Sequence, residues 1–131
     1  MNILNLLSQY GPVLNSKTGE EQPLKDLPFR YLGVYFTATW CSYCWKIVDK
    51  MPNLVAAVNS RGSHFRLLTL RLDEDETNFG YSDLRFKSMN NEIASGIANA
   101  LGVYHIPKIV VYDYLGRLVS TNGFNDMNSY R

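Results

Sequence analysis

Cys41 and Cys44 are the only two cysteines in this chain of 131 residues, and two residues separate them. Positions i and i+3 lie on one face of a helix, so two thiols at this spacing can close a small disulfide ring with little movement of the chain. An apolar run over residues 31–36 precedes the pair, and residues 45–51 read as the start of a helix. A Cys-x-x-Cys pair at such a strand-to-helix junction is a candidate for reversible dithiol–disulfide chemistry.

The place of each cysteine predicts a different role. Cys41 would lie at the helix start, where several backbone N–H groups lack partners and the helix dipole favours a thiolate. We therefore expect the pKa of Cys41 to fall below the free value of about 8.5, within the range of roughly 3.5 to 7.5 found in such motifs, and Cys41 to be the nucleophile. Cys44, one turn deeper, is expected to be the resolving thiol that attacks the mixed disulfide on Cys41.

Three other interpretations of the cysteine pair compete with this one. Cys-x-x-Cys is also half of a zinc site, but a closed site needs four ligands. The two histidines, His64 and His105, are far apart in the sequence, so we expect no metal. A purely structural disulfide is not expected in a reducing compartment such as the cytosol, where thiols stay reduced. The third interpretation, that the two cysteines are buried residues without a shared role, would apply if no other motif accompanied them.

Composition and charge are those of an ordinary globular protein. Hydrophobic residues make up 46% of the chain and charged residues 19%, so disorder is not expected. The formal net charge of +1 gives no electrostatic case for binding nucleic acid. No apolar stretch approaches the ~20 residues that span a bilayer, and the N-terminus lacks the features of a secretory signal. We expect a single domain over residues 1–131, a cytoplasmic location and a monomer, with no membrane segment evident in the sequence.

Hydrophobic periodicity and turn residues predict the elements around the motif. Continuous or alternating apolar runs indicate strands, and apolar residues at helical spacing indicate helices. The expected strands are residues 31–36, 65–72, 108–113 and 117–120, with a small hairpin over 13–24. The expected helices are residues 45–58, kinked at Pro52, 77–86 and 90–101, with a short helix near Asn125 and a helical turn at 24–27. Residues 1–10 are expected to form either a helical turn or a short strand.

The order of these elements predicts an α/β fold, in which a central mixed β-sheet is flanked by helices on both faces. The strand–helix–strand unit over residues 31–72 gives a parallel pair with a right-handed crossover. The two closing strands are joined by a short turn and add antiparallel pairing. A loop that contains Ile106-Pro107 leads into the first of them.

This order resembles that of the thioredoxin superfamily, with Trp-Cys-x-x-Cys early in the chain and Ile106-Pro107 about sixty residues later. Within the superfamily, residues 35–41, Tyr-Phe-Thr-Ala-Thr-Trp-Cys, are similar to the Tyr-Phe-Ser-Ala-Ser-Trp-Cys stretch of the tryparedoxin and nucleoredoxin branch. The acidic run at residues 72–76 and the aromatic residues at 79–81 are also similar to that branch. The resemblance covers approximately residues 14–120.

The resemblance implies a thioredoxin fold with a cis peptide bond between Ile106 and Pro107, beside the cysteines. It also implies that the backbone of Ile106 pairs with a bound substrate chain, a form of strand addition. Trp40, Ser42 and Tyr43 would complete the substrate-binding surface, although Trp40 taken alone could equally be a core residue. The implied activity is reduction of protein disulfides without a bound cofactor, with a low-molecular-weight dithiol or a flavoprotein reductase as electron donor.

The chain departs from the family pattern at several positions near the cysteines. Ser42-Tyr43 replaces the Gly-Pro of thioredoxins and the Pro-Pro of tryparedoxins, which leaves the reduction potential open. Trp45 stands where a basic residue is usual, Asp49 where the helix-kinking proline is usual, and Tyr35 where thioredoxins have a buried acidic residue. Because Tyr43 and Trp45 enlarge the apolar surface, the alternative function is a redox-sensing binding module with little catalytic turnover.

Overall fold

The computed structural model describes residues 2–62, 64–73, 83–87 and 91–123. Within these residues the strands are β1 (Val13–Asn15), β2 (Glu21–Gln22), β3 (Tyr31–Thr37), β4 (Phe65–Arg71), β5 (Leu84–Phe86), β6 (Lys108–Asp113) and β7 (Leu118–Ser120). The α-helices are α1 (Ile3–Ser8), α2 (Ser42–Ile47), α3 (Met51–Asn59) and α4 (Asn91–Ala100), and the 3-10 helices are η1 (Leu24–Asp26) and η2 (Val48–Lys50).

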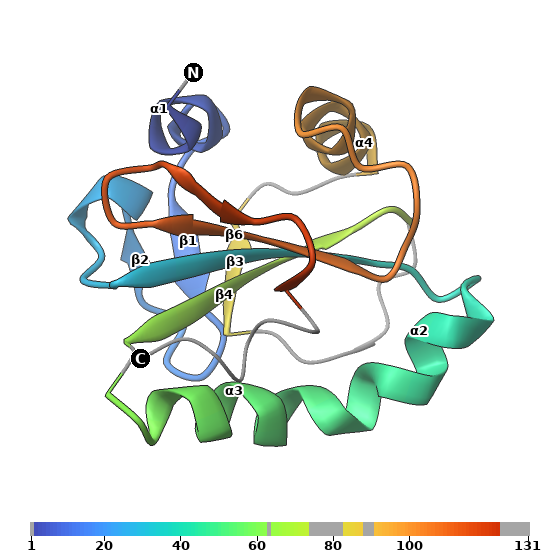
Figure 1. Ribbon diagram of the computed structural model, residues 1–131. Coiled ribbons are helices and arrows are strands. Elements are labelled where there is room, and N and C mark those ends of the chain that lie inside the picture. Colours follow the sequence, from blue (N-terminus) through green and yellow to red (C-terminus); the bar gives the residue numbers. More distant parts are fainter. Residues whose placement is uncertain (1, 63, 74–82, 88–90, 124–131) are drawn as a thin grey trace.

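All seven strands form one mixed sheet in the order β2-β1-β5-β4-β3-β6-β7 (Figure 1). β3 lies at its centre, parallel to β4 and antiparallel to β6. Six of the seven residues of β3 are buried, as expected for a strand that is covered on both faces. The structure confirms the predicted α/β fold class and the predicted hairpins β1–β2 and β6–β7.

The helices cover both faces of the sheet, as Figure 1 shows: α1 and α4 lie on one face, and α2 and α3 on the other. Successive side chains of β3 point to opposite faces and therefore divide between two cores. Val34 and Phe36 pack in the core with α1 and α4. Tyr35 packs in the other core, together with Met51, Val55 and Val58 of α3.

The helix after the cysteines differs from the prediction of one kinked helix over residues 45–58. The structure divides it into α2 and α3, with the 3-10 turn η2 between them. Pro52 lies in the first turn of α3, where a residue needs no N–H donor, so it begins a helix instead of kinking one. The break falls around Asp49, which is within η2.

The predicted helix over residues 77–86 is wrong at its end, where Leu84–Phe86 forms strand β5. Leu84 and Phe86 are buried and Arg85 is exposed, which is the alternation of a strand and not the spacing of a helix. Residues 77–82, the acidic residues 74–76, the aromatic residues 79–81 and the proposed turn near Asn125 lie outside the described residues.

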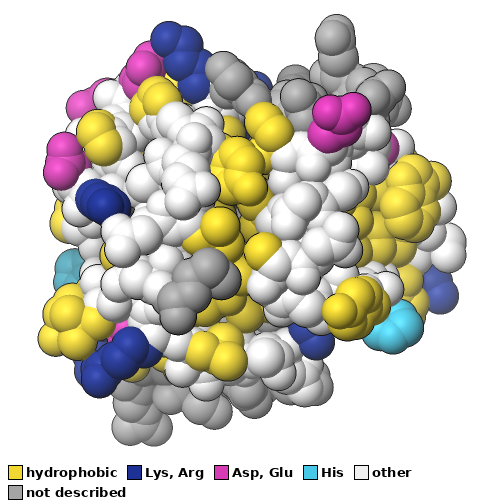
Figure 2. Space-filling view, turned by 90° about the horizontal axis from the view of Figure 1, so that it is seen from above, with side chains coloured by type: hydrophobic (Ala, Val, Ile, Leu, Met, Phe, Trp, Pro, Cys, Tyr) yellow, Lys and Arg dark blue, Asp and Glu magenta, His cyan; other side chains and the backbone are white. Residues whose placement is uncertain are grey.

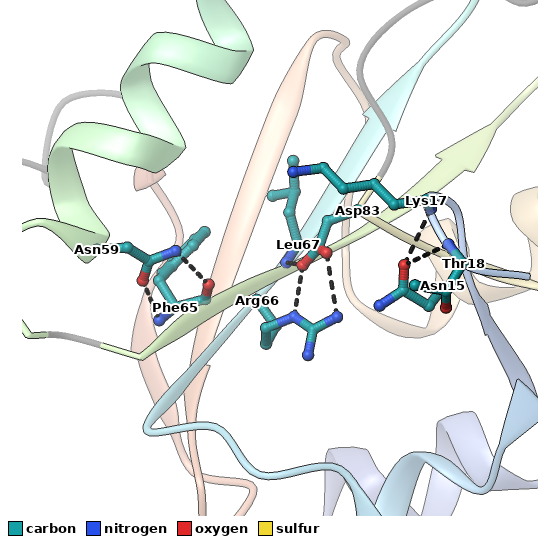
Figure 3. A network of polar contacts seen from close by, with 8 residues as sticks. All are labelled: Asn15, Lys17, Thr18, Asn59, Phe65, Arg66, Leu67 and Asp83. Carbon is teal, nitrogen blue, oxygen red and sulfur yellow. Dashed lines mark hydrogen bonds and ion pairs between the residues drawn. The ribbon is translucent and has the colours of Figure 1, made fainter. Parts of the chain in front are cut away.

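Side-chain hydrogen bonds hold the start of β4 and the residue before β5 (Figure 3), at the opposite end of β3 and β4 from the cysteine motif. Asn59, at the end of α3, bonds through its amide to both the N–H and the carbonyl of Phe65, at 2.6 and 3.0 Å. Asp83 forms a bidentate ion pair with Arg66, at 2.7 and 3.1 Å, and accepts from the N–H of Leu67. These contacts fix the register of β4 and the approach to β5.

The parallel register of β3 and β4 determines where the chain leaves the sheet. Thr37 pairs with Arg71 at the carboxyl ends of the two strands, and the N–H of Leu72 donates to the Thr37 carbonyl at 2.9 Å. The segments that follow both strands therefore emerge at the same edge of the sheet. The cysteine motif lies in the segment that follows β3.

Candidate functional site

Cys41 is the N-cap residue of α2, and both cysteines are free thiols in this structure. Its backbone is extended, with φ −94 and ψ 110, and its Sγ accepts a hydrogen bond from the backbone N–H of Cys44 at 3.2 Å. Cys41 retains 8% of its surface exposed, whereas Cys44 is completely buried. The motif therefore places one slightly exposed and one completely buried cysteine within a single helical turn.

The loop before β6 lies against the cysteine pair. The peptide bond between Ile106 and Pro107 is cis, as the family resemblance implied. Cys41 Sγ lies 3.8 Å from the carbonyl oxygen of Ile106, and Ile106 and Val48 pack against the cluster that the two cysteines form. Residues more than sixty positions apart in the sequence thus form one site.

Burial dominates the chemistry of Cys44. Burial is the largest cause that raises the pKa of its thiol to about 11; the adjacent Cys41 thiol contributes to this rise, and contacts with Thr37 and the Ala38 backbone oppose it. Cys44 is consequently a neutral thiol at neutral pH. It must lose a proton before it can attack a disulfide.

Tyr35 lies in the core below the motif, in the position where thioredoxins have a buried acidic residue. Its side chain is completely buried. Burial raises the pKa of its hydroxyl; a contact with Thr37 opposes this rise, and the two cysteines add to it. Tyr35 therefore stays neutral and is not an ionised base for Cys44.

Four exposed aromatic side chains, which we call the aromatic rim, come from the two segments that carry the cysteines and the cis peptide. Their exposed fractions are large: 67% for Trp40, 61% for Tyr43, 55% for Trp45 and 79% for Tyr104. Figure 2 shows hydrophobic side chains gathered at the same end of the molecule, on the right of the view. The reading of Trp40 as a core residue is therefore wrong. Ser42 is also exposed.

The predictions from sequence missed a polar network beside the motif. Asp73 accepts hydrogen bonds from the N–H of Thr39, at 2.6 Å, and from its hydroxyl. Trp45 Nε1 donates to the Thr39 carbonyl at 2.7 Å. The register offers a signal that could have revealed the first contact, because Thr39 and Asp73 each lie two residues beyond the paired Thr37 and Arg71.

Within the described part of the chain, no group of three or more His, Cys, Asp or Glu side chains is arranged to hold a metal ion. None of the helices described here combines the length and the apolar character needed to cross a membrane.

The comparisons with known proteins point to one branch of redox proteins, although no family model matches the chain. Probable nucleoredoxin 1 of Arabidopsis thaliana is 30% identical over an alignment of 119 residues that covers 86% of this chain and 20% of that protein. Nucleoredoxin of Xenopus laevis is 23% identical over an alignment of 118 residues that covers 86% of this chain and 28% of that protein. The chain thus spans less than a third of the length of these curated relatives.

Solved structures show the same fold. Tryparedoxin II from C. fasciculata superposes with a TM-score of 0.77 at 17% identity, covering 96% of this chain and 88% of that chain. Tryparedoxin I from Leishmania major gives a TM-score of 0.76 at 16% identity, covering 97% and 90%. Thioredoxin from Wuchereria bancrofti gives 0.71 at 17% identity, covering 92% and 87%.

Proposed function

The chain belongs to the thioredoxin superfamily, in its tryparedoxin- and nucleoredoxin-like branch, and on that basis we propose that it is a thiol–disulfide oxidoreductase that reduces protein disulfides. The observation that carries the proposal is the position of Cys41 Sγ, between the Cys44 N–H at 3.2 Å and the Ile106 carbonyl at 3.8 Å. The reacting sulfur is thus placed next to the backbone that would receive a substrate chain.

In the first step, the Cys41 thiolate attacks one sulfur of a substrate disulfide. A Cys41–substrate disulfide forms, the substrate S–S bond breaks, and the departing thiolate takes up a proton. Two features favour Cys41 for this step. It is the more exposed of the two cysteines, and the Cys44 N–H donates to its sulfur, a bond that strengthens when the acceptor is charged.

In the second step, Cys44 loses its proton and attacks Cys41 Sγ. The Cys41–Cys44 disulfide forms and the second substrate thiol leaves, so the substrate gains two electrons and the protein loses two. The complete burial of Cys44 favours this order, because a bulky external disulfide cannot reach its sulfur. An external dithiol, either a low-molecular-weight one or that of a flavoprotein reductase, would then reduce the protein.

The substrate chain would lie along Ile106 and Pro107, with Trp40, Ser42 and Tyr43 at its sides. Support comes from the exposure of all three side chains around the motif. Ile106 is only partly buried, so its backbone can pair with an incoming extended segment.

Reduction of insulin disulfides, with dithiothreitol as donor, tests the proposal. Cys41→Ser should abolish turnover, because no nucleophile remains. Cys44→Ser should also stop turnover but accumulate a covalent adduct between Cys41 and an insulin chain, visible by mass spectrometry without reductant. Full activity of Cys41→Ser would contradict the proposal.

The aromatic rim favours a second candidate, a redox-sensing binding module with little turnover, because such exposed apolar surface is typical of a docking site. Insulin reduction far slower than that of an ordinary thioredoxin, together with partner binding that changes between the dithiol and disulfide forms, would support this alternative.

A further inference from the structure

Thr39 lies in the turn between β3 and α2, two residues before Cys41, and each of its polar groups has a partner from outside the turn. Its N–H and its hydroxyl both donate to Asp73 Oδ2, the former at 2.6 Å. Its carbonyl accepts from Trp45 Nε1 at 2.7 Å. A turn residue that is bonded at the N–H, the hydroxyl and the carbonyl has little freedom to rotate.

The acceptor for Thr39 is itself fixed in place. Arg71 donates to both oxygens of Asp73, at 2.9 and 3.1 Å, and the Asp73 side chain is only 7% exposed. Burial opposes ionisation of this carboxyl, but hydrogen bonds from Arg71 and Thr39 outweigh it and lower the pKa of Asp73. Asp73 is therefore a charged, rigid anchor at the end of β4.

Trp45 closes the other side of the turn. Residues 39 and 45 are joined by the indole hydrogen bond, and both cysteines lie between them in the chain. The indole N–H is used for this bond, while more than half of the Trp45 surface remains exposed. Trp45 therefore presents an apolar face to solvent and at the same time holds the turn between β3 and α2 through its hydrogen bond to Thr39.

We propose that Trp45 is a positioning residue for the redox chemistry, because its indole N–H, acting with the Asp73 anchor on Thr39, fixes the turn that carries Cys41. The inference rests on the proposed function. The turn sets the distance between Cys41 Sγ and its two neighbours, the Cys44 N–H and the Ile106 carbonyl. If the turn is released, Cys41 spends less time in that position, and its thiolate loses the hydrogen bond that stabilises it.

The variant Trp45→Phe tests the proposal, because phenylalanine keeps an aromatic face and lacks the N–H. The rate of Cys41 alkylation by iodoacetamide at neutral pH should fall roughly two- to tenfold, the range that corresponds to the loss of one hydrogen bond. The kcat for insulin reduction should fall by a similar factor, with KM nearly unchanged because the apolar face remains. Tyr114→Phe, which changes an exposed aromatic residue in the β6–β7 turn, should leave both rates unchanged.

A raised KM with normal Cys41 alkylation would overturn the proposal and leave Trp45 as a docking residue only. Unchanged values throughout would overturn it as well. If Trp45→Phe fails to fold, Thr39→Val provides the second test, because it removes the hydroxyl bond to Asp73 and should also slow alkylation. Alkylation does not require turnover, so an inactive wild-type protein would contradict the proposed function without deciding the role of Trp45.

Discussion

The backbone N–H of Cys44 donates to Cys41 Sγ across 3.2 Å, while the Cys44 sulfur is itself completely buried. The two thiols of one motif therefore have different surroundings. Cys41 has a hydrogen-bond donor and keeps 8% of its surface exposed, whereas burial raises the pKa of the Cys44 thiol. This asymmetry supports the proposal that Cys41 is the attacking thiol and Cys44 the resolving thiol.

Alkylation should distinguish the two thiols. Iodoacetamide at neutral pH should add once to the reduced protein, on Cys41, because Cys44 is shielded and burial raises its pKa to about 11. Peptide mapping by mass spectrometry locates the adduct, and the unfolded protein, in which both thiols are exposed, is the control. Equal labelling of both cysteines in the folded protein would contradict the assignment.

Asp73→Asn should make the protein less stable by about 1.5–3 kcal/mol at neutral pH, the range for hydrogen bonds to a charged group. The folded state lowers the pKa of Asp73, so its contribution is present above the unfolded value of about 3.9 and disappears as the pH falls through the folded value. Urea unfolding of both proteins should show a difference at neutral pH that shrinks in acid. A difference independent of pH would mean that packing, not charge, is responsible.

Trp40→Ala should raise the KM for insulin at least severalfold with little change in stability. The side chain is 67% exposed, so its loss removes docking surface and hardly any core packing. Tyr114→Ala is a matched control, because it is similarly exposed at 59% but follows the far end of β6 from Pro107. Equal effects of the two variants on KM would contradict a role of the aromatic rim in substrate binding.

Gly33→Ala should make the protein less stable by about 1–3 kcal/mol, because an added carbon atom in a well-packed core usually costs that much free energy. A Cβ on Gly33 would lie 2.6 Å from Phe65 Cζ and 3.0 Å from Leu67 Cδ1, and both side chains are completely buried. Gly96→Ala, in α4, would meet nothing within 4 Å and should stabilise the protein by about 0.5–1 kcal/mol. Thermal unfolding measures both, and a neutral Gly33→Ala would contradict this view of the core.

Much of the fold could be predicted from the sequence because its signals are local. The buried strand β3 appears as an apolar run, and α4 appears as apolar residues at helical spacing that end at Gly102, whose φ of 70 suits glycine. β5 could not be predicted in this way, since three residues carry little pattern and their strand partners are β1 and β4, far away in the sequence.

The candidate site likewise contains residues that local sequence signals indicate and contacts that depend on the fold. The motif and the resemblance point to Cys41, Cys44 and Pro107, which the structure brings together, whereas the contact between Thr39 and Asp73 joins residues 34 positions apart. That contact depends on the exact pairing of β3 with β4, which the sequence pattern does not specify. The sequence does not predict the indole bond of Trp45 for a different reason, since the position of Trp45 in the motif indicates only a larger apolar surface.

The reduction potential of the Cys41–Cys44 pair tests the central claim most directly. The protein is equilibrated in thiol buffers of defined potential, and its free thiols are then trapped and counted by mass spectrometry. We expect both thiols to disappear together into an intramolecular disulfide, with a potential of about −270 to −200 mV, the range of reducing thioredoxin- and glutaredoxin-type proteins. Failure to form that disulfide, or a potential near −120 mV as in strong oxidants, would contradict a disulfide reductase.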